Sequence, residues 1–228
     1  MRLMKIAAIG ILAAGAAIGA ALFSQGGNTQ TAPKVKEKMV EGDSIVVAGG
    51  CFWCLEPQFE MLKGVQHVEV GYAGGARPNP TYEQVSTGAT GHAEAVKVVF
   101  DPKLISADDL LRIFFTIHDP TTKDRQGPDS GPQYRSTVFF SNDAEKARAQ
   151  RIIDEIEKEG LYPDPVVTTL EPLENYTIAE DYHQDYFKKY EEASDLKKMT
   201  MNAGYCRVVV EPKVRKFREK FRHLLKDE

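Results

Sequence analysis

Hydrophobic and polar positions follow two alternating periods from about residue 44 onward. Apolar or alternating runs of strand length occupy residues 44–48, 65–72, 93–100, 134–140 and 166–170. Apolar residues at helical spacing occur in the run that follows Cys51 and in residues 106–117, 143–159 and 177–190. Strands that alternate with helices in this way predict one domain of the α/β or α+β class.

Two stretches, residues 74–91 and 118–135, interrupt this pattern. Both are rich in glycine and proline and also carry aromatic and charged side chains. Loops of this length are uncommon in a compact domain unless they have a function. We therefore expect both loops to contribute to a functional site.

The first 23 residues have a different pattern. Arg2 and Lys5 precede an uncharged run, residues 6–23, which is just long enough to span a bilayer. We predict a signal peptide or membrane anchor over residues 1–23, a polar linker over 24–43 and one folded domain over 44–228. The basic flank predicts a cytoplasmic N-terminus, so the domain is expected to be exported, either periplasmic or membrane-anchored facing the periplasm. The pattern does not distinguish a cleaved signal peptide from a retained membrane anchor.

The C-terminal segment predicts an amphipathic helix. Val214, Phe217, Phe221 and Leu224 fall on one helical face, and basic residues dominate the rest of the segment. This pattern is typical of a helix that packs its apolar face on the domain and exposes its basic face to solvent. Contact between the basic face and a membrane surface is the alternative interpretation.

Composition, net charge and cysteine count limit the possible functions of the chain. The chain has 228 residues, 42% of them hydrophobic, which is enough for a full core, and a net charge of −4 gives no indication of a nucleic-acid partner. Its three cysteines, Cys51, Cys54 and Cys206, are too few for a disulfide scaffold. They also lack the paired spacing of a zinc site, so we predict neither a metal nor another cofactor.

Cys51 follows a double glycine at the end of a predicted strand, and helical spacing begins directly after it. A helix start offers unpaired backbone N–H groups and a favourable dipole, both of which stabilise the nucleophilic thiolate. The alternative is a buried structural cysteine beside a core Phe and Trp. The double glycine and the second cysteine, Cys54, favour chemistry.

Several ordered motifs together resemble one family, the A-type peptide methionine sulfoxide reductases. The matching segments are Gly50-Cys51-Phe52-Trp53, Gly71-Tyr72-Ala73-Gly74-Gly75, Pro80-Thr81-Tyr82-Glu83-Gln84-Val85, Gly91-His92-Ala93-Glu94-Ala95-Val96, His118-Asp119-Pro120-Thr121-Thr122, Arg125-Gln126-Gly127-Pro128-Asp129, Gln133-Tyr134-Arg135-Ser136 and Ala179-Glu180-Asp181-Tyr182-His183-Gln184. The resemblance implies reduction of methionine-S-sulfoxide. It also implies a single-domain two-layer α/β sandwich of the α+β class, a ferredoxin-like roll with a mixed sheet, long functional loops and a coiled C-terminal tail.

The resemblance also implies a role for each candidate residue. Cys51 is the nucleophile, which becomes a sulfenic acid as the thioether leaves. The apolar neighbours of Glu94 predict a buried carboxyl with a raised pKa, suited to a general acid. The remaining candidates contact the substrate: Tyr82 and Tyr134 at the sulfoxide oxygen, Asp129 in the pocket, and Phe52 and Trp53 around the S-methyl group.

The sulfenic acid must then be resolved by a second thiol. Cys206 matches the family's C-terminal resolving position, in a segment that we expect to be mobile. Cys54 is a second candidate, although residues three apart on a helix have Cβ atoms about 5–6 Å apart, which is wide for a disulfide. The disulfide would then be reduced by a thioredoxin-like dithiol partner.

Two other functions remain open from the sequence. The Cys51–Cys54 pair at a strand–helix junction could mark a thiol–disulfide oxidoreductase of the thioredoxin type. That interpretation leaves Glu94 and the two loop tyrosines without a role. A non-catalytic binding module for methionine-rich segments is the other alternative.

Overall fold

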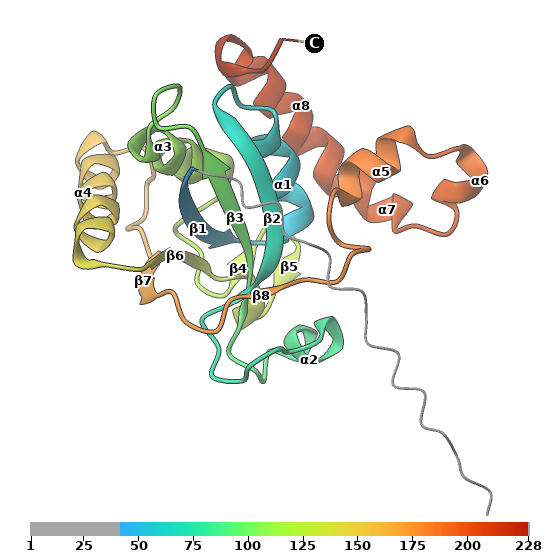
Figure 1. The fold of residues 1–228 in the computed structure, drawn as a ribbon, viewed down its shortest axis with the longest axis horizontal. Helices are drawn as coiled ribbons and strands as arrows, with labels where there is room; N and C mark the ends of the chain where they lie inside the picture. The colour runs from blue at the N-terminus through green and yellow to red at the C-terminus, as the bar shows by residue number, and fades with distance from the viewer. Residues whose placement is uncertain (1–41, 228) are drawn as a thin grey trace, which may run out of the picture. The chain divides into compact units, whose positions relative to one another are not determined.

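The computed structural model describes residues 42–227. One mixed sheet has the strand order β7-β6-β1-β3-β2-β8 (Figure 1). The strands are β1 (Asp43–Gly49), β2 (Val65–Ala73), β3 (Ala93–Phe100), β6 (Ser136–Phe140), β7 (Thr169–Pro172) and β8 (Thr177–Ile178). Strands β6 and β7 are parallel, and the other neighbours pair antiparallel. Strands β4 (Arg125–Gln126) and β5 (Asp129–Ser130) form a separate two-stranded pair.

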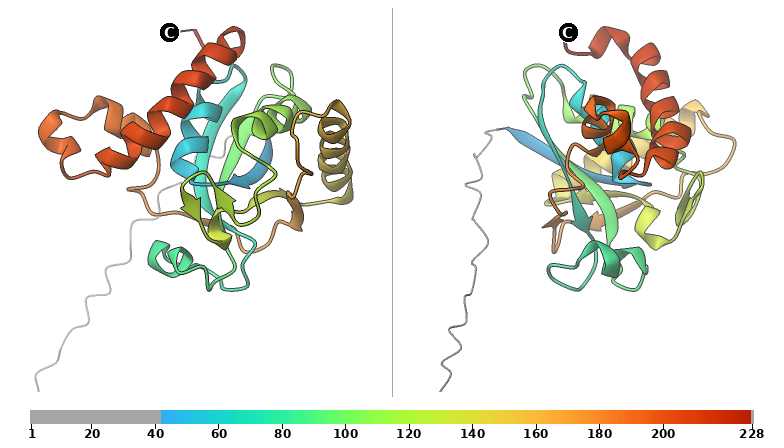
Figure 2. Two further views of the ribbon diagram at one scale, coloured as in Figure 1. Left: turned by 180° about the vertical axis from the view of Figure 1, so that it is seen from behind. Right: turned by 90° about the vertical axis from the view of Figure 1, so that its right-hand side faces the viewer.

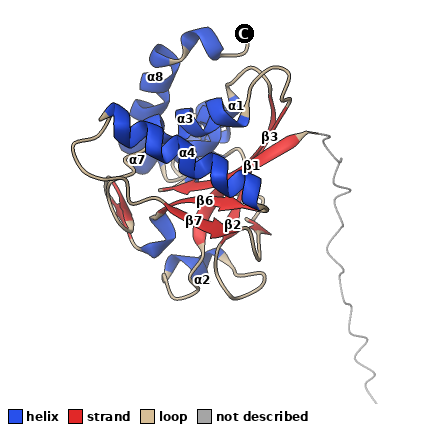
Figure 3. Cartoon of the chain, turned by 90° about the vertical axis from the view of Figure 1, so that its left-hand side faces the viewer, coloured by secondary structure: helices blue, strands red, loops and turns tan. Residues whose placement is uncertain are grey.

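Helices cover one face of this sheet. The helices α1 (Phe52–Glu60), α3 (Ala107–Ile117) and α4 (Asp143–Glu159) gather on one side, as Figure 3 shows. Side chains alternate along β1, so Val47 joins the large core beneath the helices while Val46 and Ala48 join a small cluster on the opposite face. The predicted two-layer α+β domain with a mixed sheet is confirmed.

The C-terminal part is more regular than the coiled tail that the family resemblance implied. It forms α5 (Tyr186–Glu192), α6 (Asp195–Lys198), α7 (Ala203–Tyr205), a π-helical stretch (Cys206–Val210) and α8 (Glu211–Lys220), and α8 runs beside α1 (Figure 2). Cys206, Val210, Val214 and Phe217 are all buried and recur every three or four residues. This apolar stripe is the physical reason for the helical tail, and it confirms the predicted docking of the C-terminal helix.

The segment predicted as a helix over residues 177–190 is wrong in its first half. Residues 177–178 form β8, turns follow, and α5 begins at Tyr186. The side chain of Gln184 donates to the carbonyl of Val70 and accepts from its N–H, both at 2.9 Å. Gln184 therefore takes the place of a strand partner, and this holds the segment in a non-helical conformation.

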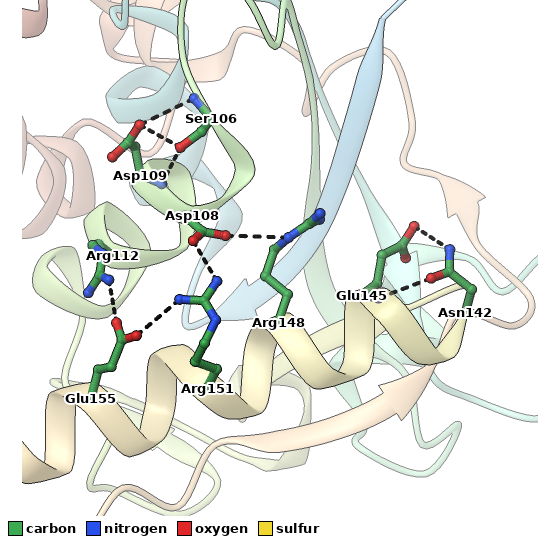
Figure 4. Close-up of polar contacts among 9 residues, drawn as sticks. All are labelled: Ser106, Asp108, Asp109, Arg112, Asn142, Glu145, Arg148, Arg151 and Glu155. Carbon is green, nitrogen blue, oxygen red and sulfur yellow. Dashed lines mark hydrogen bonds and ion pairs between the residues drawn. The ribbon is translucent and has the colours of Figure 1, made fainter.

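The helices α3 and α4 are joined by ion pairs at their exposed faces (Figure 4). Asp108 accepts from Arg151 at 2.5 Å and lies 3.4 Å from Arg148. Glu155 pairs with Arg151 at 3.0 Å and with Arg112. Each such exposed pair contributes little to stability, because water and salt screen it.

Helix α3 begins with the capping arrangement that its sequence suggests. The hydroxyl of Ser106 accepts from the N–H of Asp109 at 3.1 Å, and the Asp109 carboxylate accepts from the N–H of Ser106 at 3.3 Å. Asn142 caps α4 in a similar way, and Gly160 ends that helix with a left-handed backbone at φ 64°. These caps explain why the bounds of both helices follow from the sequence.

The predicted signal or anchor segment, residues 1–23, and most of the predicted linker lie outside the described residues. Between residues 42 and 227, no helix combines the length and apolar character that crossing a membrane requires. The same described range holds no group of three or more side chains suited to bind a metal ion.

Candidate active site

The turn between β1 and α1 places Cys51 at the start of a helix, as predicted. Cys51 is the N-cap residue of α1, with an extended backbone. Gly50 precedes it with φ +97°, and a Cβ at this position would come within 2.6 Å of the Gln126 side chain. Glycine is therefore required here both by the backbone conformation and by the close approach of the loop that carries Gln126.

The surroundings of Cys51 differ from the prediction of a ready thiolate. Its side chain is 8% exposed. Burial raises the pKa of the Cys51 thiol well above its usual value, with a further contribution from a hydrogen bond to Cys54 and from the charge of Glu94. Cys51 therefore holds its proton at neutral pH, because loss of hydration outweighs the effect of the helix start.

Glu94 lies directly beside this helix start. It shares a face of β3 with Val96 and Val98, which are part of the core beneath the helices. Its Oε2 accepts from the N–H of Phe52 at 3.1 Å. Burial raises the pKa of the Glu94 carboxyl to about 8, against the opposite effect of this hydrogen bond. The predicted burial and the predicted direction of the pKa shift are both confirmed.

A cavity of about 190 Å³ opens at this point. Its lining includes seven of the nine candidate residues: Cys51, Phe52, Trp53, Tyr82, Glu94, Asp129 and Tyr134. Both long loops contribute side chains to it, so the expectation that these loops build a functional site agrees with the geometry. The volume suits a small side chain rather than a large cofactor.

The two loop tyrosines line this cavity together with Glu94. Tyr82 is the first residue of α2 (Tyr82–Ser86), and Tyr134 ends a short 3₁₀ turn (Pro132–Tyr134). Burial raises the pKa of both hydroxyls, and the charge of Glu94 adds to the shift. Both tyrosines therefore keep their protons and can donate hydrogen bonds to an oxygen atom in the cavity.

Trp53 forms another part of the cavity wall. Its indole stacks on Tyr186 with a ring-centroid separation of 3.7 Å and an interplanar angle of 6°. Its Nε1–H donates to Nδ1 of His183 at 3.1 Å. Burial lowers the pKa of His183 to about 4, so the imidazole is neutral and Nδ1 is free to accept. His183 is thus a structural residue that holds Trp53.

The other two cysteines are Cys54, on α1, and Cys206, in the C-terminal segment. The hydroxyl of Tyr205 donates to Oδ2 of Asp129 at 2.7 Å and lies 4.0 Å from the sulfur of Cys54. Cys206 follows Tyr205 directly and is fully buried. Burial raises the pKa of Cys206 to about 11. All three cysteines are free thiols.

Sequence reasoning missed several residues of this site. Asn202 and Tyr205 also line the cavity. Glu180 accepts from the N–H of Tyr82 at 2.9 Å and from the hydroxyl of Tyr72 at 2.8 Å. Glu180 lies in one of the segments that resemble the family, and Tyr205 adjoins Cys206. Nothing in the local pattern, however, showed what either residue contacts.

Comparison with known proteins identifies the family of this chain. The family model for peptide methionine sulfoxide reductase matches residues 43–225. The chain belongs to the peptide methionine sulfoxide reductase family. It is an oxidoreductase that reduces methionine sulfoxide, as the resemblance in its sequence implied.

Individual relatives agree with this assignment. The peptide methionine sulfoxide reductase MsrA of Polynucleobacter asymbioticus is 50% identical over 179 residues, which are 78% of this chain and 89% of that protein. An MsrA of Thermus thermophilus is 48% identical over 79% of this chain and 96% of that protein. Among solved structures, reduced Mxr1 from Saccharomyces cerevisiae is 35% identical with a TM-score of 0.63, over 69% of this chain and 93% of that one. Methionine sulfoxide reductase A of Corynebacterium diphtheriae is 34% identical with a TM-score of 0.57, over 67% of this chain and 76% of that one.

Proposed function

We propose that the reductase acts on the S epimer of methionine sulfoxide, in proteins, in peptides or as the free amino acid. Cys51 is the nucleophile and Glu94 is the proton donor. The observation that carries this proposal is the buried Glu94 carboxyl, with a pKa of about 8, bonded to the backbone of the residue after Cys51. The S preference rests on the family resemblance.

The substrate side chain fits in this cavity. The sulfoxide oxygen lies toward Glu94, Tyr82 and Tyr134, which can all donate hydrogen bonds to it. The S-methyl group lies against Phe52 and Trp53, because aromatic faces favour contacts with methyl groups and sulfur. This arrangement presents the sulfoxide sulfur to the thiol of Cys51.

Reduction then transfers the sulfoxide oxygen to Cys51. Glu94 protonates the sulfoxide oxygen, which makes the sulfur electrophilic, and the sulfur of Cys51 attacks it. The oxygen passes to Cys51 as a sulfenic acid, the thioether of methionine leaves, and the thiol proton of Cys51 returns to Glu94. The substrate gains two electrons, and Cys51 loses two.

Cys206 then resolves the sulfenic acid. Its sulfur attacks the sulfur of Cys51, water leaves, and a Cys51–Cys206 disulfide forms. The position of Tyr205 in the cavity lining supports this, since Cys206 is the next residue. Cys54 stays the second candidate, because it also lies beside Tyr205 and interacts with Cys51. A thioredoxin-like dithiol then reduces the disulfide and is itself oxidised.

The domain is further proposed to act outside the cytoplasm. The support is the sequence alone, with Arg2 and Lys5 ahead of an uncharged run of membrane-spanning length. A reporter that is active only outside the cytoplasm, fused after residue 45, should therefore give a signal. An expressed fusion that gives no reporter signal would contradict this location.

Turnover with the two separated sulfoxide epimers tests the reaction itself. We expect thiol-dependent reduction of the S epimer by the wild type and complete loss of turnover in Cys51→Ser with the fold intact. Turnover of insulin disulfides without turnover of either sulfoxide would favour the thiol–disulfide oxidoreductase. Residual sulfoxide reduction in Cys51→Ser above a tenth of wild type would remove Cys51 from its role.

The resolving cysteine needs its own measurement. Cys206→Ser should still release one methionine per protein but lose recycling by a thioredoxin-like reductant. Cys54→Ser should recycle nearly as the wild type does, because the helical spacing of Cys51 and Cys54 is wide for a disulfide. Peptide mapping of the oxidised protein gives the bond directly. A dominant Cys51–Cys54 bond with fully active Cys206→Ser would reverse the order of the two candidates.

A further inference from the structure

A buried carboxylate outside the cavity is left without a role by the mechanism above. Glu56 lies on α1, one turn after Phe52, and is 1% exposed. Its two oxygens accept from backbone N–H groups across the molecule, Oε1 from Asp185 at 2.6 Å and Oε2 from Tyr186 at 3.3 Å. A carboxylate buried to this degree is uncommon unless it is paired.

The segment that Glu56 binds has no cap of its own. Asp185 is the N-cap residue of α5, yet its side chain makes no capping hydrogen bond. Glu56 supplies the missing acceptor from a different helix. Asp185 also adopts a left-handed backbone, φ 51° and ψ 31°, which costs free energy for a residue other than glycine. The bonds to Glu56 hold this conformation in place.

The same segment carries the groups that fix the substrate wall. Tyr186 stacks on Trp53, and His183 accepts from the Trp53 indole N–H. Trp53 and Glu56 both belong to α1, so Glu56 joins the helix that carries Trp53 to the segment that packs against its ring. The carboxylate therefore sets the distance between the two parts of this wall.

We propose that Glu56 is a positioning residue for substrate binding, which holds the 183–186 segment against Trp53 through two backbone hydrogen bonds. Glu56 touches neither the cavity nor the reacting atoms, so its effect passes through Tyr186 and His183. This inference rests on the proposed function in one respect: it takes the Trp53 wall as the contact for the S-methyl group.

Glu56→Gln tests the proposal with a nearly isosteric change. The amide oxygen can accept from one N–H, while the amide NH₂ faces the other N–H and repels it. We expect KM for the S-sulfoxide to rise about tenfold, as expected when one buried N–H loses its acceptor, with kcat changed less than about threefold. Trp53 is the only tryptophan of the chain, so its fluorescence should change as the stack on Tyr186 loosens.

Glu60→Gln is the matched control. Glu60 lies one turn further along the same helix and also faces Asp185, but it binds neither of the two N–H groups. It should keep the wild-type KM and the wild-type fluorescence. An equal change in both variants would mean that loss of a nearby negative charge, rather than loss of the two hydrogen bonds, is the cause.

Asp185→Gly in the Glu56→Gln background gives a rescue test. Glycine adopts the left-handed conformation readily, so the segment then depends less on Glu56. The double variant should recover part of the lost affinity and the wild-type emission, and it serves as the measured protein if Glu56→Gln alone does not fold. A double variant as defective as the single one, or a folded Glu56→Gln with wild-type KM and fluorescence, would overturn the proposal. A wild type without sulfoxide reduction would instead refute the proposed function.

Discussion

Carboxylates hold two parts of this reductase together by different physical means. Between α3 and α4, Asp108 and Glu155 are partly exposed and pair with arginines, and hydrogen bonds from Arg151 lower the pKa of Glu155. Around α1, Glu56 and Glu94 are buried, accept from backbone N–H groups, and have pKa values raised by burial to about 8.

The difference shows what each arrangement is suited to do. An exposed ion pair keeps its carboxylate ionised and is weakened by salt, so it can join two helices but cannot deliver a proton near neutral pH. A buried carboxyl without a cation binds its proton more tightly and titrates near neutrality. Proton donation at the site therefore needs a buried carboxyl without a cation, although this arrangement is the less favourable one for the stability of the fold.

Glu94→Gln should produce the largest contrast between the two regions. The amide still accepts from the N–H of Phe52 but has no acidic proton, so the step that forms the sulfenic acid should slow by about 10²–10⁴-fold. In the wild type this rate should fall as pH rises through about 8, where Glu94 ionises, and that fall should be absent from the variant. Single-turnover release of methionine measures both. An unchanged rate in Glu94→Gln would remove Glu94 from the mechanism.

The same variant should be more stable than the wild type at neutral and alkaline pH. The pKa of Glu94 is about 8 in the folded protein, above its ordinary value of 4.5, so the folded state binds the proton more tightly. The contribution of the protonated Glu94 carboxyl to the free energy of unfolding is fully present below about pH 4.5 and is lost as pH rises toward 8. The melting temperature of Glu94→Gln should therefore exceed that of the wild type by a margin that widens across this range. Glu56 titrates in both proteins, so the difference isolates Glu94. A constant margin would contradict the raised pKa.

Glu155→Gln should have the smallest effect. It removes the pairs with Arg112 and Arg151 on the exposed face of α3 and α4. We expect wild-type turnover and a small fall in melting temperature that disappears at high salt. Thermal melts at low and high salt measure this. A salt-independent loss, or a change in KM, would mean that this face is coupled to the site.

Sequence periodicity predicted the central strands and the helices α3 and α4 well, because each has a strong apolar pattern and local caps. It failed at residues 177–185, where the bonds of Gln184 to Val70 override the local helical pattern. A side chain that replaces a strand partner leaves no periodic signal. The amphipathic pattern predicted α8, but not the short helices α6 and α7 that precede it.

The reacting groups of the site were predictable, but their support was not. Cys51, Glu94 and the loop tyrosines carry chemistry in their residue types and lie in recognisable motifs. The hydrogen bond that Glu180 accepts from Tyr82 joins residues 98 positions apart, and the bonds that Glu56 accepts from the 183–186 segment join residues 129 and 130 positions apart. The thiol pKa was also predicted in the wrong direction, because burial of Cys51 depends on the closed tertiary structure.

The strand order has a consequence for the way the molecule opens. Strand β3, which carries Glu94, is hydrogen-bonded to β1 on one side and β2 on the other, whereas β8 lies at the sheet edge and pairs through two residues. Amide hydrogens should therefore exchange early at β8 and late at β3. The 183–186 segment follows β8. Brief local opening there would release the support of Trp53, while Glu94 and Cys51 keep their positions.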